Sequence, residues 1–298
     1  MSGPTWRSGH LWKWAKAMLF ILPALLFYII FLFIPVCNTI QLSFYDWDGA
    51  SSVMKFIGIE NYKEIFMDDI FWKALSHNIF WIVFTIVVPV LTGFFLAVLL
   101  NQKGIRGRML FKVTFFMPAV VSLVAVGIIF EWIYNPSFGI LDRALKAIGL
   151  NLLALDWLGD PNVVLWALLI AGSWTYYGFC MVIYMAAFSG LDVSYLEVAR
   201  IEGANPFQTF FYVVAPLLRN TTTLLVLNSL IGSFKVFDIV YVMTKGGPYY
   251  SSEVISTYMF RTAFNFSEVG KGAAISVVLA VIIACCSSAY LKYEERED

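Results

Sequence analysis

Polar side chains interrupt two long apolar stretches of the sequence. The later stretch carries Asn228, Ser229 and Ser233, and the two serines lie four residues apart on one face of a helix. The earlier stretch carries Thr175 and Tyr176. Hydroxyl groups beside aromatic faces suit a solute that presents both hydrogen-bonding groups and apolar C–H patches, as a sugar does. Close packing between helices also explains small polar residues, so both interpretations stay open.

Sequence patterns for catalysis, nucleotide binding and metal binding are missing. The chain has no G-x-x-x-x-G-K-[ST] loop to hold nucleotide phosphates, and no paired carboxylates or Ser-His-Asp set. His10 and His77 belong to no metal-ligand spacing, and the four cysteines form no C-x-x-C pair. We therefore expect no enzymatic activity, no metal and no cofactor in this chain.

The composition indicates a chain that is embedded in a membrane. Of its 298 residues, 60% are hydrophobic and 13% charged, against about 25% charged in a soluble domain. The formal net charge of +0 provides no basic field for nucleic acid. A helix needs about 20 mainly apolar residues to cross the bilayer core. We predict an all-α membrane protein with one domain, residues 1–298, and six spans at approximately 17–37, 78–100, 111–133, 162–188, 213–243 and 272–291.

Basic residues concentrate in alternate links between the predicted spans, and this bias sets the orientation of a membrane protein. With six spans, all the basic segments lie on one side, which is therefore cytoplasmic, with both termini on that side. The link at residues 46–72 is acidic and falls on the outer side. The basic residues are Arg7, Lys13, Lys16, Lys103, Arg106, Arg108, Lys112, Arg200, Arg219, Lys292 and Arg296.

The predicted cytoplasmic loop at residues 190–212 contains two helix starts in close succession. Ser194 with Glu197 has the spacing of a capping box, which predicts a first helix over residues 195–202. Gly203 can end that helix, because glycine adopts a left-handed conformation at no steric cost.

The second helix of this loop begins at Asn205. Asn205 is a preferred N-cap, Pro206 fits the first turn, and Gln208 stands three residues after the cap. An apolar stripe follows with spacing i, i+3, i+4, i+7: Phe207, Phe210, Phe211 and Val214. A helix pair of this kind either docks on another protein or lies on lipid headgroups.

Three segments in this order resemble one family. Glu197, Val198, Ala199, Gly203, Ala204 and the run 216–218 resemble the EAA loop of binding-protein-dependent ABC importer permeases. Residues 237–248 resemble the signature of the carbohydrate branch of that family, which imports maltose, glycerol phosphate and oligosaccharides. Residues 56–72 are similar to the first external loop of the same branch. The resemblance extends over residues 17–291, with Val198 and Ala215 departing from the usual residues.

The resemblance implies roles for particular residues. In this family the EAA loop is a coupling helix that inserts into a groove of the ATPase subunit, and the helix after it contributes to the sugar site in maltose-type permeases. The implied coupling residues are Glu197, Ala199, Glu202, Gly203, Ala204 and Pro206, and the signature residues are Asp238, Gly246, Gly247 and Pro248. Among the residues that their chemistry suggests for a solute path (Thr175, Tyr176, Asn228, Ser229 and Ser233), the resemblance favours Ser229 and Ser233.

The resemblance also implies partners. We expect a type I ABC importer permease in the bacterial cytoplasmic (inner) membrane. Its expected partners are a second and different permease subunit, two ATPase subunits that bind Mg-ATP, an extracytoplasmic solute-binding protein, membrane lipid and a sugar-like solute. The sequence does not identify the solute, since a disaccharide, an oligosaccharide, a glycerol phosphate and a glycosylated compatible solute would all fit.

Two other functions are compatible with a membrane-embedded helical chain. An ion-coupled secondary transporter needs ionisable residues in the membrane, and the candidates are Lys235 and Asp238, which are three residues apart and can pair. A membrane scaffold would use the 190–216 loop only to dock other proteins.

Overall fold

The computed structural model describes residues 8–102, 104–192 and 194–296, apart from the side chains of residues 8–17, 200 and 206. Among the residues used above, Arg7 and Lys103 lie outside the described part, as do the side chains of Lys13, Lys16, Arg200 and Pro206. The chain divides into two compact units. Unit 1 combines the described part of residues 1–65 with 262–277, and unit 2 combines 66–261 with the described part of 278–298.

Unit 1 is a helical segment with a small hairpin. Asn61 closes the hairpin region, because its Nδ2 donates to the carbonyls of Ser43 and Tyr45 at 2.9 and 3.0 Å. Lys271 at the start of α16 pairs with Glu64 at 3.1 Å. The elements of unit 1 are α1 (Ser8–Tyr28), a π-helical turn (Ile29–Phe33), α2 (Ile34–Leu42), the antiparallel strands β1 (Tyr45–Asp46) and β2 (Lys55–Phe56), α3 (Glu60–Met67) and the first turns of α16 (Val269–Glu294).

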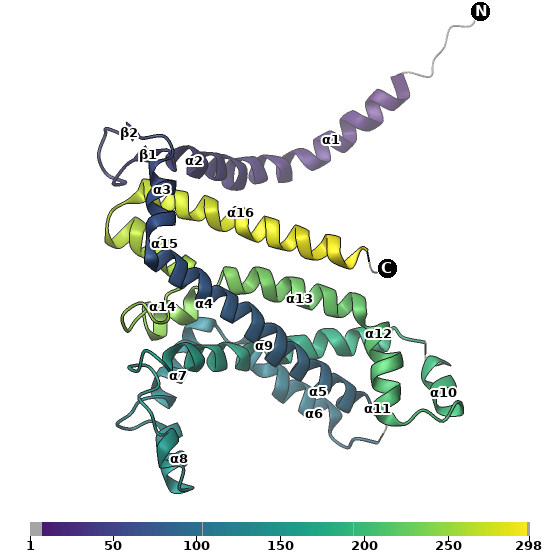
Figure 1. Ribbon diagram of the computed structural model, residues 1–298. Helices are drawn as coiled ribbons and strands as arrows, with labels where there is room; N and C mark the ends of the chain where they lie inside the picture. Colours follow the sequence, from purple (N-terminus) through teal and green to yellow (C-terminus); the bar gives the residue numbers. More distant parts are fainter. Residues whose placement is uncertain (1–7, 103, 193, 297–298) are drawn as a thin grey trace, which may run out of the picture. The chain divides into compact units, whose positions relative to one another are not determined.

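Unit 2 is a bundle of long helices, several of which are broken (Figure 1). Asp68 caps the first of them by accepting a hydrogen bond from the amide of Ile70 at 2.8 Å. The elements are α4 (Asp69–Thr85), a π-helical turn (Ile86–Val90), α5 (Leu91–Asn101), α6 (Arg108–Phe116), a 3₁₀ turn (Met117–Val120), α7 (Leu123–Ile133), α8 (Ile140–Ala147), a 3₁₀ turn (Asn151–Leu153), α9 (Val164–Ser189), α10 (Ser194–Ile201), α11 (Pro206–Thr209), a π-helical turn (Phe210–Val214), α12 (Ala215–Leu217), α13 (Arg219–Phe234), α14 (Asp238–Met243), α15 (Ile255–Phe260), the π-helical turn (Arg261–Asn265) at the unit boundary, and the remainder of α16.

Helix α9 is the centre of unit 2 and packs directly along α5. Gly93 permits this close approach, because a Cβ at its position would lie only 2.5 Å from the Cβ of Cys180. One buried cluster lies along this contact and includes Phe94, Met181 and Tyr184. A second buried cluster joins α4 and α9 to α7 and α14. The loops at residues 190–217 and 244–254 lie at opposite ends of this bundle (Figure 1).

Five of the six predicted spans correspond to helical segments that are long enough to cross a membrane, and the third does not. Among the described residues, five helical segments are long and apolar enough to cross a membrane: 18–42, 69–101, 164–189, 219–243 and 269–294. A sixth candidate, Arg108–Val120 with Leu123–Ile133, is bent by 98°. The predicted continuous span at 111–133 was therefore wrong in its geometry.

The bend has a local cause. Pro118 has no amide hydrogen and its ring clashes with the preceding turn, so the helix tightens into a 3₁₀ turn there. Val121 and Ser122 then adopt extended conformations, with ψ of 138° and 134°, before α7 starts. The span predicted at 213–243 is also interrupted, at Leu218 and between α13 and α14. Hydropathy counts side chains and misses such backbone breaks.

Candidate functional site

A cavity of about 160 Å³ inside unit 2 brings together all five residues predicted to line a solute path. It lies between α4, α9 and α13, and its wall also includes Trp81, Thr85, Gly232 and Val236. The predicted residues in the wall are Thr175, Tyr176, Asn228, Ser229 and Ser233. The sequence pattern therefore selected residues of two separate helices that the fold does bring to one surface.

Tyr176 links the two helices that carry most of these residues. Its hydroxyl donates to Oδ1 of Asn228 at 3.1 Å, and Oγ of Ser229 lies 3.3 Å from the same hydroxyl. Ser229 also donates to the carbonyl of Leu225 at 2.8 Å. An aromatic ring, an amide and a hydroxyl thus form one polar network on the cavity wall.

The other hydroxyls differ in how far their hydrogen-bonding capacity is used. Thr175 donates to the carbonyl of Gly172 at 2.7 Å, within its own helix. Thr85 does the same toward Trp81 at 2.6 Å. Ser233 is 96% buried, and within the described part of the chain its hydroxyl makes a single long contact, 3.5 Å to the Thr85 hydroxyl. Ser233 is therefore the serine with more capacity to bind a solute hydroxyl.

Trp81 is a site residue that the sequence analysis missed. It is 5% exposed, lines the cavity, and its indole Nε1–H has no hydrogen-bond partner among the described residues. Gly172 leaves room for the ring, since a Cβ there would lie 2.8 Å from an indole carbon. A buried donor without a partner costs roughly 1–3 kcal/mol, which a bound acceptor would recover. In the sequence Trp81 stands near the start of the span predicted at 78–100, where interfacial tryptophans are common, so its position carried no signal for a site residue.

The second candidate site is the loop between α9 and α13. Helix α10 begins at Ser194, and the amide of Ser194 donates to Oδ1 of Asp192 at 2.9 Å. This bond keeps the pKa of Asp192 below its usual value. The described residues contain no hydrogen bond between Ser194 and Glu197, so an aspartate two residues upstream replaces the predicted capping box.

The predicted end of the first helix is confirmed at Gly203, which has φ of +79°. The amide of Ala204 reaches back to the carbonyl of Ala199 at 2.9 Å, the bond that closes a Schellman cap. The predicted capping box of the second helix is confirmed as well. The amide of Gln208 donates to Oδ1 of Asn205 at 2.8 Å, and the amide of Asn205 donates to Oε1 of Gln208 at 2.9 Å.

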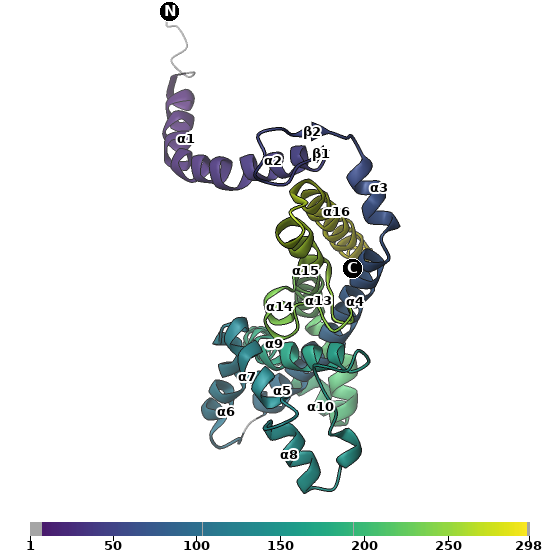
Figure 2. The same cartoon turned by 90° about the vertical axis from the view of Figure 1, so that its left-hand side faces the viewer.

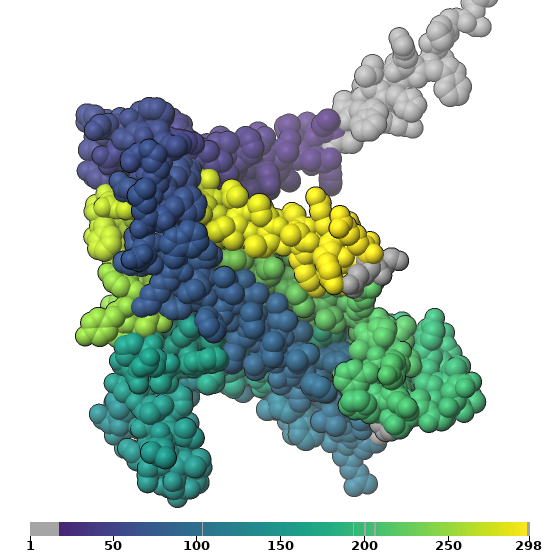
Figure 3. Space-filling model, viewed as in Figure 1, coloured from purple at the N-terminus to yellow at the C-terminus, as the bar shows by residue number. Residues whose placement is uncertain are grey.

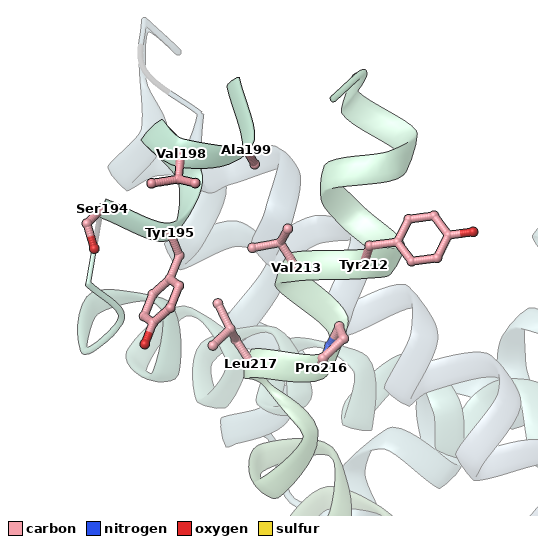
Figure 4. Close-up of a pocket in the computed structure, with 8 residues that line it drawn as sticks. All are labelled: Ser194, Tyr195, Val198, Ala199, Tyr212, Val213, Pro216 and Leu217. Carbon is pink, nitrogen blue, oxygen red and sulfur yellow. The ribbon is translucent and has the colours of Figure 1, made fainter. Parts of the chain in front are cut away.

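A hollow of about 500 Å³ separates α10 from the helix of residues 207–217. Val213 and Leu217 point across it toward α10, while Tyr212 points away (Figure 4). Ala199 is buried, whereas Tyr195 and Val198 are 54% and 56% exposed. Glu197, Glu202 and Gly203 are exposed, Ala204 is half-buried, and α11 begins at Pro206.

The predicted apolar stripe of the second helix is divided between two environments. Phe210 and Val214 pack into the core, where the rings of Phe210 and Phe94 are 5.0 Å apart. Phe207 and Phe211 stay 71% and 48% exposed. The stripe is thus divided between residues that anchor the segment in the core and residues that remain on its surface.

The signature segment forms a fixed loop at the opposite end of unit 2. Asp238 is exposed at the first position of α14, and Lys235 is exposed after α13, with no ion pair between them among the described residues. Gly246 has φ of +84° and packs against the Glu253 carboxylate. Gly247 and Pro248 follow, and Ser252 donates to the carbonyl of Gly247 at 2.6 Å.

Arg261, which follows α15, fixes this loop through its guanidinium group. Its guanidinium pairs with Glu253, whose side chain is fully buried, and donates to the carbonyl of Lys245 at 2.7 Å. It also lies 4.7 Å from the ring centre of Tyr250. Burial raises the pKa of Glu253, while Thr257 and Arg261 act in the opposite direction. The described residues contain no group of three or more His, Cys, Asp or Glu that could hold a metal ion.

The sequence of this chain matches one family of transport proteins. The sequence model described as binding-protein-dependent transport system inner membrane component matches residues 89–296. The chain belongs to this family of transport permeases. Family membership makes the chain a multi-pass membrane permease.

Relatives cover nearly all of this permease. The Bacillus subtilis protein named probable ABC transporter permease protein YurN is 34% identical over 276 residues, 92% of this chain and 94% of the relative. The lactose transport system permease protein LacF of Rhizobium radiobacter is 30% identical over 272 residues, 90% of each chain.

A solved structure confirms the fold. A chain of a bacterial ABC transporter involved in alginate import matches with a TM-score of 0.84 and 21% identity, covering 96% of this permease and 99% of that chain. The all-α permease fold of ABC importers is thereby confirmed.

Proposed function

We propose that this permease forms half of the membrane pathway of an ATP-driven, binding-protein-dependent importer of a sugar or sugar-like solute. The cavity between α4, α9 and α13 is the observation that carries this proposal. Its wall combines two aromatic rings with hydroxyl and amide groups, and one buried donor, Nε1 of Trp81, lacks a partner among the described residues. The lactose permease named among the relatives supports a carbohydrate as the solute.

The size of the cavity supports a pathway shared between two subunits. Its volume of about 160 Å³ is below the ~300–1,000 Å³ of typical ligand pockets. A second, different permease would supply the opposite wall of the chamber. The solute would then contact both chains, with Trp81, Tyr176, Asn228, Ser229 and Ser233 as the contribution of this one.

The loop of residues 190–212 is the proposed contact with the ATPase subunits. Two capped helices present exposed Glu197, Glu202 and Phe207 at one end of the bundle, and Figure 3 shows this segment projecting from unit 2. Phe210 and Val214 anchor the same segment in the core. A partner that binds the exposed side can therefore move core helices when its own domains close.

The remaining partners follow from the same proposal. Two ATPase subunits would bind Mg-ATP, and an extracytoplasmic solute-binding protein would deliver the solute at the end that carries the 244–254 loop. Under this proposal both termini would lie in the cytoplasm of a bacterial cell, as the basic residues between the spans predict. The binding protein must prefer one state of the permease pair, because a partner shifts an equilibrium only through a difference in affinity.

ATP hydrolysis by the purified complex tests the proposal. The chain is co-expressed with its genomic neighbours, reconstituted in vesicles and supplied with the cognate binding protein and a panel of sugars. Stimulation of hydrolysis by one loaded binding protein would support the importer and name the solute. Solute uptake that needs an ion gradient but no ATP would favour the secondary transporter instead, and docking without any uptake would favour the scaffold.

A further inference from the structure

Helix α8 is attached to unit 2 along one side. Asp142 is 6% exposed and accepts a hydrogen bond from the indole of Trp157 at 3.2 Å. The ring of Trp157 stacks on Tyr134, which follows α7, with centroids 5.7 Å apart. Leu141 packs against the buried cluster beneath. These contacts fix both the position and the rotation of the helix.

The other sides of α8 have two different surfaces. At 100° per residue, Ile140, Ala144 and Ile148 fall on one flank, and Arg143 and Lys146 fall on the other. Ile140 and Ile148 are 68% and 70% exposed, and Arg143 and Lys146 are exposed as well. The apolar surface continues beyond the helix at Leu150, Leu152 and Leu153, of which Leu152 is 92% exposed.

The direction of α8 matches that of a membrane surface. In Figures 1 and 2 the helix runs across the long axis of α9 and extends sideways beyond the bundle of unit 2. Since α9 crosses the membrane, a helix transverse to it runs parallel to the bilayer plane. The exposed residues Val124, Ile128 and Trp132 form a strip along α7 that leads to α8, and an exposed tryptophan at a span end is typical of the interface.

We propose that α8 is an interfacial helix that lies on the membrane and binds anionic lipid headgroups. Its apolar flank, Ile140, Ala144 and Ile148, enters the boundary between headgroups and acyl chains. Arg143 and Lys146, on the opposite flank, contact the phosphate groups. This assignment depends on membrane embedding alone and is independent of the solute.

Charge and area both favour lipid over a protein partner. The acidic residue of α8, Asp142, is buried, so the exposed charges of the helix are cationic. Lys146 lies 3.9 Å from the Asp142 carboxylate but its side chain stays 57% exposed, and Arg143 is the other exposed cation. Protein interfaces of ordinary size bury about 800 Å² on each side, more than one flank of an eight-residue helix offers. The anchor would hold α7, whose Gly127 lies against Val242 of α14, at a fixed depth.

Spin-label accessibility tests this proposal. Single nitroxide labels are placed at Ile148→Cys and Arg143→Cys in the full chain, and the complex is reconstituted without binding protein. The exposed Cys37 and Cys285 and the half-buried Cys286 are replaced by alanine. Val124→Cys is the lipid-facing reference. We expect the label at position 148 to be more accessible to oxygen than to a water-soluble nickel complex, at a depth of about 5–10 Å, and the label at 143 to show the reverse.

Two results would overturn the proposal. A label at position 148 that is more accessible to nickel than to oxygen would place the helix in water. A label that is protected from both reagents, with or without binding protein, would place it against another protein. A second arm tests the cations: Arg143→Gln with Lys146→Gln should move the 148 label outward in vesicles that contain phosphatidylglycerol and leave it unmoved in pure phosphatidylcholine. An equal shift in both lipids would contradict headgroup binding.

Discussion

Substitution of Gly203 gives the sharpest test of the coupling loop. This residue has φ of +79°, and a Cβ built on it meets no atom within 4 Å. Steric clashes therefore contribute nothing, and the cost of a side chain is conformational. An L-residue in the left-handed region costs about 1–2 kcal/mol, which reduces the population of the turn roughly 5–30-fold.

The order of the variants follows from the same argument. Asparagine visits the left-handed region more readily than other residues, alanine less so, and β-branched valine is a genuine outlier there. We expect Gly203→Asn, Gly203→Ala and Gly203→Val to lower ATP-driven uptake in that order, with the valine variant close to inactive. Both uptake in vesicles and recovery of the ATPase with the affinity-purified permease are measured.

Gly107 supplies a matched control. It precedes α6, has φ of +76° and is equally open around its Cβ position. Gly107→Val carries a similar backbone cost at a site outside the coupling loop, so uptake should remain near the wild-type rate. Normal uptake by Gly203→Val, or an equal loss in Gly107→Val, would refute the reasoning.

Four further predictions concern the cavity, the second cap and the fixed loop. Trp81→Phe removes a donor that has no partner among the described residues, so the protein without solute should be equally or more stable. The apparent affinity for solute should fall about 2–12-fold, because one hydrogen bond to the solute is lost. An unchanged KM for uptake would exclude Trp81 from the solute path. Asn205→Ala should cost about 1 kcal/mol of local stability, seen as faster amide exchange at Gln208, and an unchanged exchange rate would contradict the cap. Arg261→Gln should destabilise the protein by about 3–5 kcal/mol, because it strands the buried Glu253 carboxylate, and the double variant with Glu253→Gln should recover most of this. Burial raises the pKa of Glu253 above its ordinary value of 4.5, so the native state holds this proton more tightly than the unfolded chain does. The stability that this carboxyl contributes is therefore lost as the pH rises from 4.5 through the raised pKa. Glu253→Gln should flatten this part of a profile of thermal stability against pH, and an unchanged profile would contradict the shift.

The parts of this protein that follow local rules could be predicted from the sequence. The cap formed by Asn205 and Gln208 depends on residues three positions apart, and it forms as the spacing requires. Gly203 adopts the left-handed conformation that ends the helix because glycine, without a Cβ, does so at no steric cost. The approximate spans follow from composition, since a bilayer demands about 20 apolar residues whatever the neighbours are.

Features that depend on the backbone or on distant partners could not be predicted in this way. The bend at Val121 and Ser122 arises from Pro118 within a stretch that remains apolar throughout. A hydropathy scan therefore does not detect the bend. Phe207 and Phe210 both belong to the predicted stripe, yet Phe210 packs against the cluster of α5 and α9 while Phe207 stays 71% exposed, because distant residues set the position of that cluster. Trp81 became a site residue only because α9 brings Gly172 against its ring.

The contacts along α9 and α13 limit how motion of the coupling loop can reach the cavity. Near the loop, the hydroxyl of Tyr184 donates to Thr222 at 3.0 Å, and at the cavity Tyr176 donates to Asn228 at 3.1 Å. These tyrosines are eight residues apart on α9, or about 12 Å along the helix. Two such ties prevent α9 and α13 from sliding independently, so we infer that they move as one body. Leu218, where the helix is broken with ψ of 9°, lies between the loop and this body and is the natural hinge. Removing one tie with Tyr184→Phe should therefore lower the number of solute molecules transported per ATP while leaving ATPase binding intact, and an unchanged ratio would show that α13 carries the motion without α9.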